Sequence, residues 1–219
     1  MIYHSISRAY LLKIFDECTN KTYYGCSQDW YATEWQRLTG CGPTAVCNII
    51  WYLKHVRPAF GLNQDCGSKE TSLSFMEEIW THVTPSAEGI PTTKLLYDSV
   101  MAYAKTKGLN VEYRVCDVPE RKDSCPTLMD VVHFLERALS EDTPIAFLNL
   151  CNGDESNLEP WHWVTIISLV YAEDGTSACV DILDGGFIKQ IDLSLWLATT
   201  ALGGGFVYFN FSVHPDRMH

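Results

Sequence analysis

The feature that most constrains the fold of this chain is a long apolar run that follows Cys41-Gly42-Pro43-Thr44. Residues 45–53 are apolar or aromatic at every position except Asn48. Pro43 suits a first helical turn, because the N–H group that proline lacks would have no helical partner there. A helix that is apolar on nearly all sides has to be buried. The sequence therefore predicts a central helix over residues 41–53, with Cys41 in its first turn and the rest of the chain packed around it.

Helical patterns dominate the middle of the chain. Apolar residues at helical spacing predict helices over residues 72–82, 92–107 and 127–140, and Gly108 ends the second of them. Before the central helix we expect a short extended piece at 22–24 and then an irregular loop up to Gly40. A second loop is expected over 57–70.

The character of the sequence changes at Pro144. Compact runs rich in β-branched and aromatic residues, separated by Gly, Asn and Asp, predict strands of one antiparallel sheet. Helices followed by strands indicate an α+β fold, with the central helix and a helical middle region packed on a C-terminal sheet. We assign residues 1–219 to one domain, in which region 72–140 carries no motif that predicts specificity. The predicted strands cover residues 145–150, 161–171, 178–183 and 206–211.

Composition and charge exclude several classes of protein. The net charge is −11, from 27 acidic and 16 basic residues, and no stretch concentrates Lys and Arg, so nucleic acid is not an expected partner. Residues 193–213 carry no charge, but Gly203–Gly205 interrupt them, and we interpret them as a helix, a glycine stop and a strand rather than a membrane span. The sequence gives no indication of oligomeric state.

Cysteine usage points to a reducing compartment. The nine cysteines form an odd number, no C-x-x-C pair occurs, and the first residues lack the pattern of a signal peptide. We therefore expect a cytoplasmic protein with reduced thiols. The absent C-x-x-C spacing argues against structural zinc, and we expect neither a metal nor a cofactor.

Cys41 differs from the other cysteines in its setting. A helix amino terminus stabilises a thiolate through its free N–H groups and its partial positive charge, and the thiolate is the nucleophilic form. Gly40 and Gly42 are expected to leave room around the sulfur for a substrate backbone. Cys41 is therefore the candidate nucleophile.

A cysteine nucleophile needs a base, and His162 is the candidate. It alone among the seven histidines enters a buried-looking strand, where Trp161 and Trp163 would lie on the opposite face and shield the sheet from water. A single histidine in an apolar strand is more often structural; the combination with Cys41 favours catalysis. The other histidines lie near the termini or on helices with charged neighbours.

The base needs a third group to orient its ring, and two carboxylates follow on the next predicted strand. Asp184 stands at the strand end before two glycines, where a turn can direct its side chain to the site, whereas Asp181 lies in mid-strand. Asp184 is preferred, although it could simply cap the turn. Donors for an oxyanion could come from the Cys41 N–H and from the amide of Gln36 or Gln28, either of which could equally be an ordinary loop glutamine.

The three segments together resemble papain-like cysteine peptidases, and within them the bacteriocin-processing, double-glycine-leader type. The matching segments are Cys41-Gly42-Pro43-Thr44, Trp161-His162-Trp163-Val164 and Ile182-Leu183-Asp184-Gly185. The resemblance implies a papain-like fold over residues 22–211, a Cys-His-Asp triad, and a peptide or protein substrate. In that family the oxyanion glutamine commonly stands six residues before the cysteine, whereas Gln36 is five and Gln28 thirteen residues before Cys41.

Two other functions remain open on the sequence alone. A non-catalytic module could bind a peptide through tryptophans at the rim of a papain-like cleft, namely Trp30, Trp35, Trp161 and Trp163. A zinc enzyme could use Cys41, His162 and Asp184 as ligands, since zinc accepts all three residue types. Hydrolysis and acyl transfer would use the same three side chains, so the fold alone does not select the acceptor.

Overall fold

A computed structural model describes residues 1–57, 67–120 and 122–213 of the chain. It is a mixed α+β structure with one large antiparallel sheet and a small two-stranded one. The helices are α1 (Glu34–Thr39), α2 (Cys41–Val56), α3 (Lys69–Trp80), α4 (Thr93–Lys107), α5 (Leu128–Ser140) and α6 (Leu193–Thr199), with short 3-10 turns η1 (Ala9–Leu12), η2 (Gln28–Trp30) and η4 (Lys122–Ser124). The strands are β1 (Ile2–Ser5), β2 (Lys13–Asp16), β3 (Lys21–Tyr24), β4 (Leu109–Val118), β5 (Ile145–Asn149), β6 (His162–Tyr171), β7 (Ala178–Asp184), β8 (Phe187–Asp192) and β9 (Gly204–Val213).

The long strand β6 organises the large sheet. The strand order is β4-β9-β5-β6-β7-β8, and β1 also pairs with β6. The first half of β6 pairs with β5 and its second half with β1, while β7 pairs along its other edge. His162 is the first residue of β6 and therefore lies at one end of this strand.

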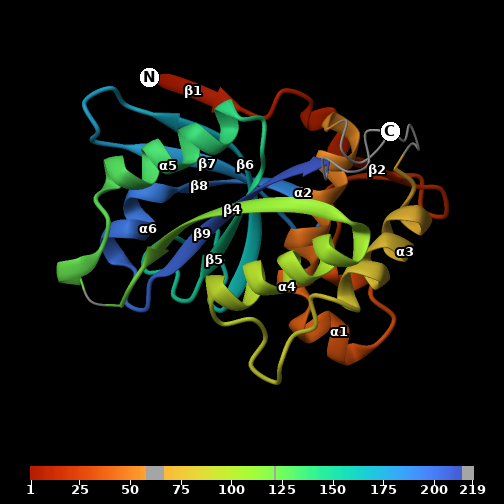
Figure 1. Cartoon of the computed structure of the whole chain (residues 1–219). Helices are drawn as coiled ribbons and strands as arrows, with labels where there is room; N and C mark the ends of the chain where they lie inside the picture. Colours follow the sequence, from red (N-terminus) through yellow and green to blue (C-terminus); the bar gives the residue numbers. More distant parts are fainter. Residues whose placement is uncertain (58–66, 121, 214–219) are drawn as a thin grey trace.

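Helix α2 packs against β6. Every residue of α2 from Cys41 to Leu53 is buried, which confirms the buried central helix. Figure 1 shows α2 beside the sheet, with α1 and α3 on its outer side and α4 along β4. Asn48 ties the helix to its surroundings, because its side chain accepts from the Cys26 N–H and donates to Thr165 of β6.

The predicted helices and strands are present, with their ends shifted by up to three residues. The helix, glycine stop and strand predicted for residues 193–213 are also found, as α6 and β9. The loop predicted over 57–70 falls mostly on residues 58–66, which lie outside the described residues. Its last part is wrong, because Lys69 already begins α3. The prediction of one domain over 1–219 stays a prediction.

Three elements correct the sequence-based picture. The predicted loop before Cys41 contains α1, which is only six residues long and begins with a capping box between Thr33 and Gln36. The predicted helical middle is interrupted by β4, an edge strand whose residues are mostly exposed or half-buried and which pairs with β9 over its full length. Strand β8 forms a hairpin with β7. In the described parts of the chain, none of the helices has the length and apolar character needed to cross a membrane.

Candidate active site

Cys41 lies at the junction of two helices. It is the first residue of α2, and Gly40 separates it from the end of α1. A side chain at Gly40 would place its Cβ 2.4 Å from the carbonyl oxygen of Gln36 and 2.8 Å from the ring of Tyr31. A Cβ at Gly42 would lie 2.8 Å from the Ile90 side chain. The space beside both glycines is therefore occupied by protein, and the expectation that they leave room for substrate is replaced by a packing requirement.

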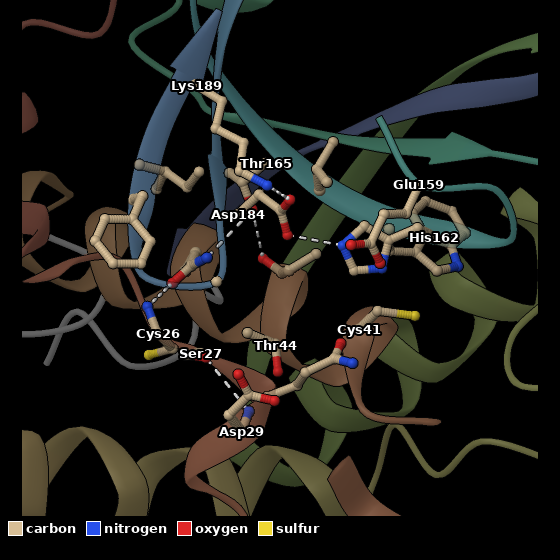
Figure 2. Close-up of a pocket in the computed structure, with 18 residues that line it drawn as sticks. Cys26, Ser27, Asp29, Cys41, Thr44, Glu159, His162, Thr165, Asp184 and Lys189 are labelled. Carbon is tan, nitrogen blue, oxygen red and sulfur yellow. Dashed lines mark hydrogen bonds and ion pairs between the residues drawn. The ribbon is translucent and has the colours of Figure 1, made fainter. Parts of the chain in front are cut away.

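His162 and Asp184 meet at the same end of the sheet. The Nε2 atom of His162 lies 2.8 Å from Oδ1 of Asp184, and the Lys189 Nζ donates to the other carboxylate oxygen at 2.6 Å (Figure 2). Asp184 ends β7, and the turn to β8 consists of Gly185 and Gly186, which both adopt positive φ angles of 59° and 83°. A two-residue hairpin turn of this kind requires such angles, and glycine adopts them without steric cost.

Neighbouring groups in the site shift the pKa values of both His162 and Asp184. Burial by itself lowers the pKa of His162, but the bond to Asp184 and the interaction with the Cys41 thiol raise that pKa from 6.5 to about 10. Burial raises the pKa of Asp184, but His162 and Lys189 lower it to about 2. The imidazole is therefore protonated and the carboxylate ionised at neutral pH. Since Nε2 is bonded to Asp184, Nδ1 is the ring nitrogen left to serve the thiol.

Cys41 is shared by two cavities. The first, of about 310 Å³, also contains His162 and Asp184. The second, of about 500 Å³, is mainly apolar and also has Cys41 in its lining. The first is further lined by Gln28, Asp29, Thr44, Glu159, Trp163, Phe187 and Lys189, among others, and the second by Leu38, Ile90, Pro91, Leu148, Leu150, Trp161 and Trp163, among others.

The two candidate oxyanion glutamines have different surroundings. Gln28 lines the first cavity, and its Nε2 donates to the Arg37 carbonyl oxygen at 2.9 Å, which leaves the second N–H of that amide available. Gln36 lines neither cavity. Its Oε1 accepts from Thr33 in the capping box, and its Nε2 donates to Glu77 at 2.8 Å. The geometry therefore favours Gln28 and gives Gln36 a role in helix structure.

The tryptophans also separate into two groups. Trp163 is buried, donates from Nε1 to the Ile90 carbonyl oxygen at 2.7 Å and lines both cavities. Trp161 precedes β6, has a positive φ of 56°, is 60% exposed and lines the apolar cavity. Trp30 and Trp35 line neither of these cavities. The predicted four-tryptophan rim is therefore reduced to Trp161 and Trp163.

Asp181, the other candidate carboxylate, takes part in local hydrogen bonds. Asp181 accepts from Ser168 at 2.7 Å and from Gln190, and it does not line either cavity. Within residues 1–57, 67–120 and 122–213, no group of three or more His, Cys, Asp or Glu side chains is arranged to hold a metal ion.

Sequence reasoning missed several residues that line the site. Asp29 on η2 and Glu159 in the loop before β6 bring carboxylates to the first cavity, and Lys189 on β8 contacts Asp184. Asn149 holds the loop by donating to the Glu159 carbonyl oxygen at 2.7 Å. The Gly185-Gly186 pair in the sequence could have predicted the contact of Lys189 with Asp184. A two-residue hairpin places Lys189 diagonally across from Asp184 on the same face of the sheet.

Comparison with known proteins supports the fold. No protein-family model matches the chain, and no curated protein sequence matches it significantly. Among solved structures, the chain is similar to UfSP from C. elegans, a cysteine protease of the papain-like fold, with a TM-score of 0.53 and 10% sequence identity. The similarity covers 97% of this chain but 34% of UfSP, so this chain spans about a third of that protein. At this identity the likeness shows the fold: mixed α+β with a large antiparallel sheet, as in papain-like proteins.

Proposed function

We propose that this protein is a cysteine peptidase or a related thiol-dependent amide hydrolase, with Cys41 as nucleophile, His162 as base and Asp184 as the group that orients His162. The observation that carries the proposal is the 2.8 Å bond between His162 and Asp184 in a cavity that also contains Cys41 at the start of a buried helix. The fold is similar to that of UfSP, a cysteine protease, which supports the same reaction class.

The proposed reaction starts from the Cys41 thiolate beside the protonated His162 ring, which carries the proton of the thiol on Nδ1. The sulfur then adds to the carbonyl carbon of an amide, and the C=O π electrons move to the oxygen. When this intermediate collapses, the C–N bond breaks and His162 gives its proton to the leaving amine. In the second half, His162 takes a proton from water and the resulting hydroxide adds to the thioester carbonyl carbon. Collapse of this intermediate breaks the C–S bond, releases the carboxylic acid and regenerates the Cys41 thiolate beside protonated His162. Asp184 holds the ring and stabilises its positive charge throughout.

Gln28 is the proposed side-chain donor to the oxyanion, together with the Cys41 backbone N–H. Its amide has one hydrogen engaged with Arg37 and one free, so the group is fixed in position before the substrate arrives. A fixed donor is more effective than a mobile one, because it does not have to reorganise as the negative charge develops.

The substrate is proposed to be a peptide or protein. A chain that crosses Cys41 would meet the apolar cavity of Ile90, Trp161 and Trp163 on one side and the polar cavity on the other. The finer resemblance to double-glycine-leader peptidases stays a prediction, as does a cytoplasmic location, which is based on the cysteine usage.

The alternative is a peptide-binding module without catalysis. The apolar cavity with the exposed Trp161 would suit it. The arrangement of His162 and Asp184 favours the enzyme, since a binding module does not require a paired histidine and carboxylate next to a thiol.

The test measures the reactivity of each thiol. The native protein is treated with iodoacetamide near pH 7, and the alkylation rate of every cysteine is determined by mass spectrometry. We expect Cys41 to react faster than the exposed Cys18, and we expect His162→Ala, but not the exposed control His133→Ala, to lower the Cys41 rate. Equal rates for Cys41 and Cys18, or no effect of His162→Ala, would contradict the proposal.

Hydrolysis is tested separately from thiol activation. The protein is incubated with a complex peptide mixture, and new termini are identified by mass spectrometry with Cys41→Ala as the matched control. Termini that depend on Cys41 support the hydrolase. An activated Cys41 without new termini, combined with retention of peptides by both the native and the Cys41→Ala protein, would favour the binding module.

A further inference from the structure

The carboxylate of Asp184 is held from two sides. One oxygen accepts from His162 Nε2 at 2.8 Å and the other from Lys189 Nζ at 2.6 Å, and Figure 2 shows Asp184 between the two cations. The Asp184 side chain is 11% exposed and that of Lys189 is 39% exposed. Both residues line the first cavity, where the Asp184 carboxylate is mostly buried and the Lys189 side chain is partly exposed.

The hairpin fixes this contact. Asp184 pairs with Phe187 across the Gly185-Gly186 turn, and Lys189 is two residues further along β8. Residues two apart on a strand point to the same face, so the Lys189 side chain is directed back over Asp184. The position of the ammonium group is therefore set by backbone register as well as by charge.

We propose that Lys189 is a positioning residue of the active site, which acts through Asp184 by fixing the plane of its carboxylate so that one oxygen faces Nε2 of His162. This proposal rests on the proposed function. A carboxylate with a single partner can rotate about its Cβ–Cγ bond, whereas one with a charged donor on each oxygen has a defined plane. Lys189 is the only cation among the described residues that contacts the second oxygen.

The Lys189–Asp184 pair differs from an ordinary surface ion pair in what its loss would change. An exposed ion pair contributes little to stability and nothing to a distant ring. Here the carboxylate is mostly buried and shared, so loss of Lys189 leaves a carboxylate oxygen without its charged donor and frees the group to turn away from His162.

Lys189 also contributes a positive charge near the ring. Two cations that share one carboxylate repel each other, so Lys189 opposes the protonation of His162. Removal of the lysine charge with the Asp184 bond intact would raise the pKa of His162, whereas loss of the bond would lower it. If Lys189 positions Asp184, the loss of the bond dominates. The charged or titratable groups that share the cavity with His162 are Cys26, Asp29, Cys41, Glu159, Asp184 and Lys189.

The experiment compares Lys189→Met, which removes the ammonium group but keeps an apolar stem, with Lys189→Arg, which keeps a charged donor. Lys105→Met on the exposed face of α4 is the matched control. The readouts are the alkylation rate of Cys41 by iodoacetamide near pH 7 and the titration of the His162 ring followed by NMR. We expect Lys189→Met to lower the alkylation rate roughly tenfold and to lower the pKa of His162. Lys189→Arg should restore most of the rate, and Lys105→Met should change neither readout.

A double-mutant cycle tests whether Lys189 acts through Asp184. In an Asp184→Asn background, Lys189→Met should have no further effect, because the carboxylate that it positions is gone. An equal effect in both backgrounds would overturn the proposal. If Lys189→Met fails to fold, as judged by circular dichroism, Lys189→Gln takes its place in the cycle.

The outcomes separate this inference from the proposed function. If Cys41 is no more reactive than Cys18 in the native protein, the proposed function fails. If Cys41 is activated and depends on His162, but Lys189→Met leaves the alkylation rate within about twofold and does not lower the pKa of His162, only the role of Lys189 is refuted.

Discussion

The pKa of His162 offers the most direct check of the site, and Asp184→Asn is the perturbation that addresses it. The substitution keeps the size of the side chain and an oxygen that can accept from Nε2, but it removes the negative charge between His162 and Lys189. The His162 side chain is 12% exposed, so solvent screens this charge only in part.

The magnitude follows from the geometry. An opposite charge in contact with an ionisable group changes its pKa by about 1 to 3. We therefore expect Asp184→Asn to lower the pKa of His162 from about 10 to about 8. At pH 9, the imidazolium fraction would fall from about 90% to about 10%.

The assay is an NMR titration of the protein with isotope-labelled histidine. The His162 signals are assigned by their loss in the His162→Ala protein. Asp181→Asn is the matched control, because Asp181 lies on the same strand but bonds to Ser168 and Gln190 instead of the site. A pKa of His162 that differs by less than about 0.3 between the native protein and Asp184→Asn would refute the reasoning. So would an equal decrease in the Asp181→Asn control.

Three further predictions address the rest of the site. Gln28→Ala should lower amide turnover by about 10²-fold with little change in unfolding temperature. Gln36→Ala should lower the free energy of unfolding by about 1 kcal/mol, because the bonds of Gln36 to Thr33 in the capping box are lost. Turnover assays and thermal unfolding distinguish the two. Trp161→Gly should change the free energy of unfolding by less than about 1 kcal/mol, since relief of the positive φ offsets the greater freedom of the unfolded chain, but it should raise KM for a peptide substrate in steady-state assays. In denaturant titrations, the stability that His162 contributes should be fully present below pH 6.5 and be lost as the pH rises through about 10, because its folded pKa is raised. The stability that Asp184 contributes should be present above pH 3.8 and be lost as the pH falls through about 2, because its folded pKa is lowered. Unfolding curves of the native and His162→Ala proteins that differ equally at pH 6 and pH 10 would contradict the expectation for His162.

Local signals predicted the elements that depend on neighbouring residues. The helix after Cys41 was predictable because an apolar run with Pro43 in its first turn has few alternatives, and α5 because its apolar residues recur at helical spacing. Glycines marked two positions correctly: Gly108 ends α4 in a left-handed conformation, and the Gly185-Gly186 pair turns the chain after Asp184.

Elements that depend on distant partners were missed. Strand β4 has a mostly exposed or half-buried pattern and follows a helix directly, so its own residues do not separate it from a loop. It exists because β9 supplies hydrogen bonds along its whole length. Helix α1 is too short to be stable by propensity alone and is held by its capping box and by its packing between η2 and α2.

The roles of the glycines and glutamines were also decided by distant contacts. Gly40 and Gly42 looked suited to substrate access, but Tyr31 and Ile90 fill the space beside them. Gln36 is closer than Gln28 to the expected spacing before Cys41, yet it bonds to Thr33 and Glu77 while Gln28 reaches the cavity. The number of residues between a glutamine and Cys41 therefore does not determine whether that glutamine side chain reaches the cavity.

The sequence by itself determined which side chains are chemically suited to the site and on which kind of element each one lies: Cys41 at a helix start, His162 on a buried strand and Asp184 before a turn. It could do so because helix burial, strand alternation and glycine turns are set by residues close together in the chain. Tertiary structure alone decided that His162 bonds to Asp184 through Nε2, that Lys189 donates to the other carboxylate oxygen, and that Cys41 lines two cavities. These relations arise from packing α2 against β6 and from the register of β7 with β8, which join residues that are distant in the sequence or that face each other across a hairpin.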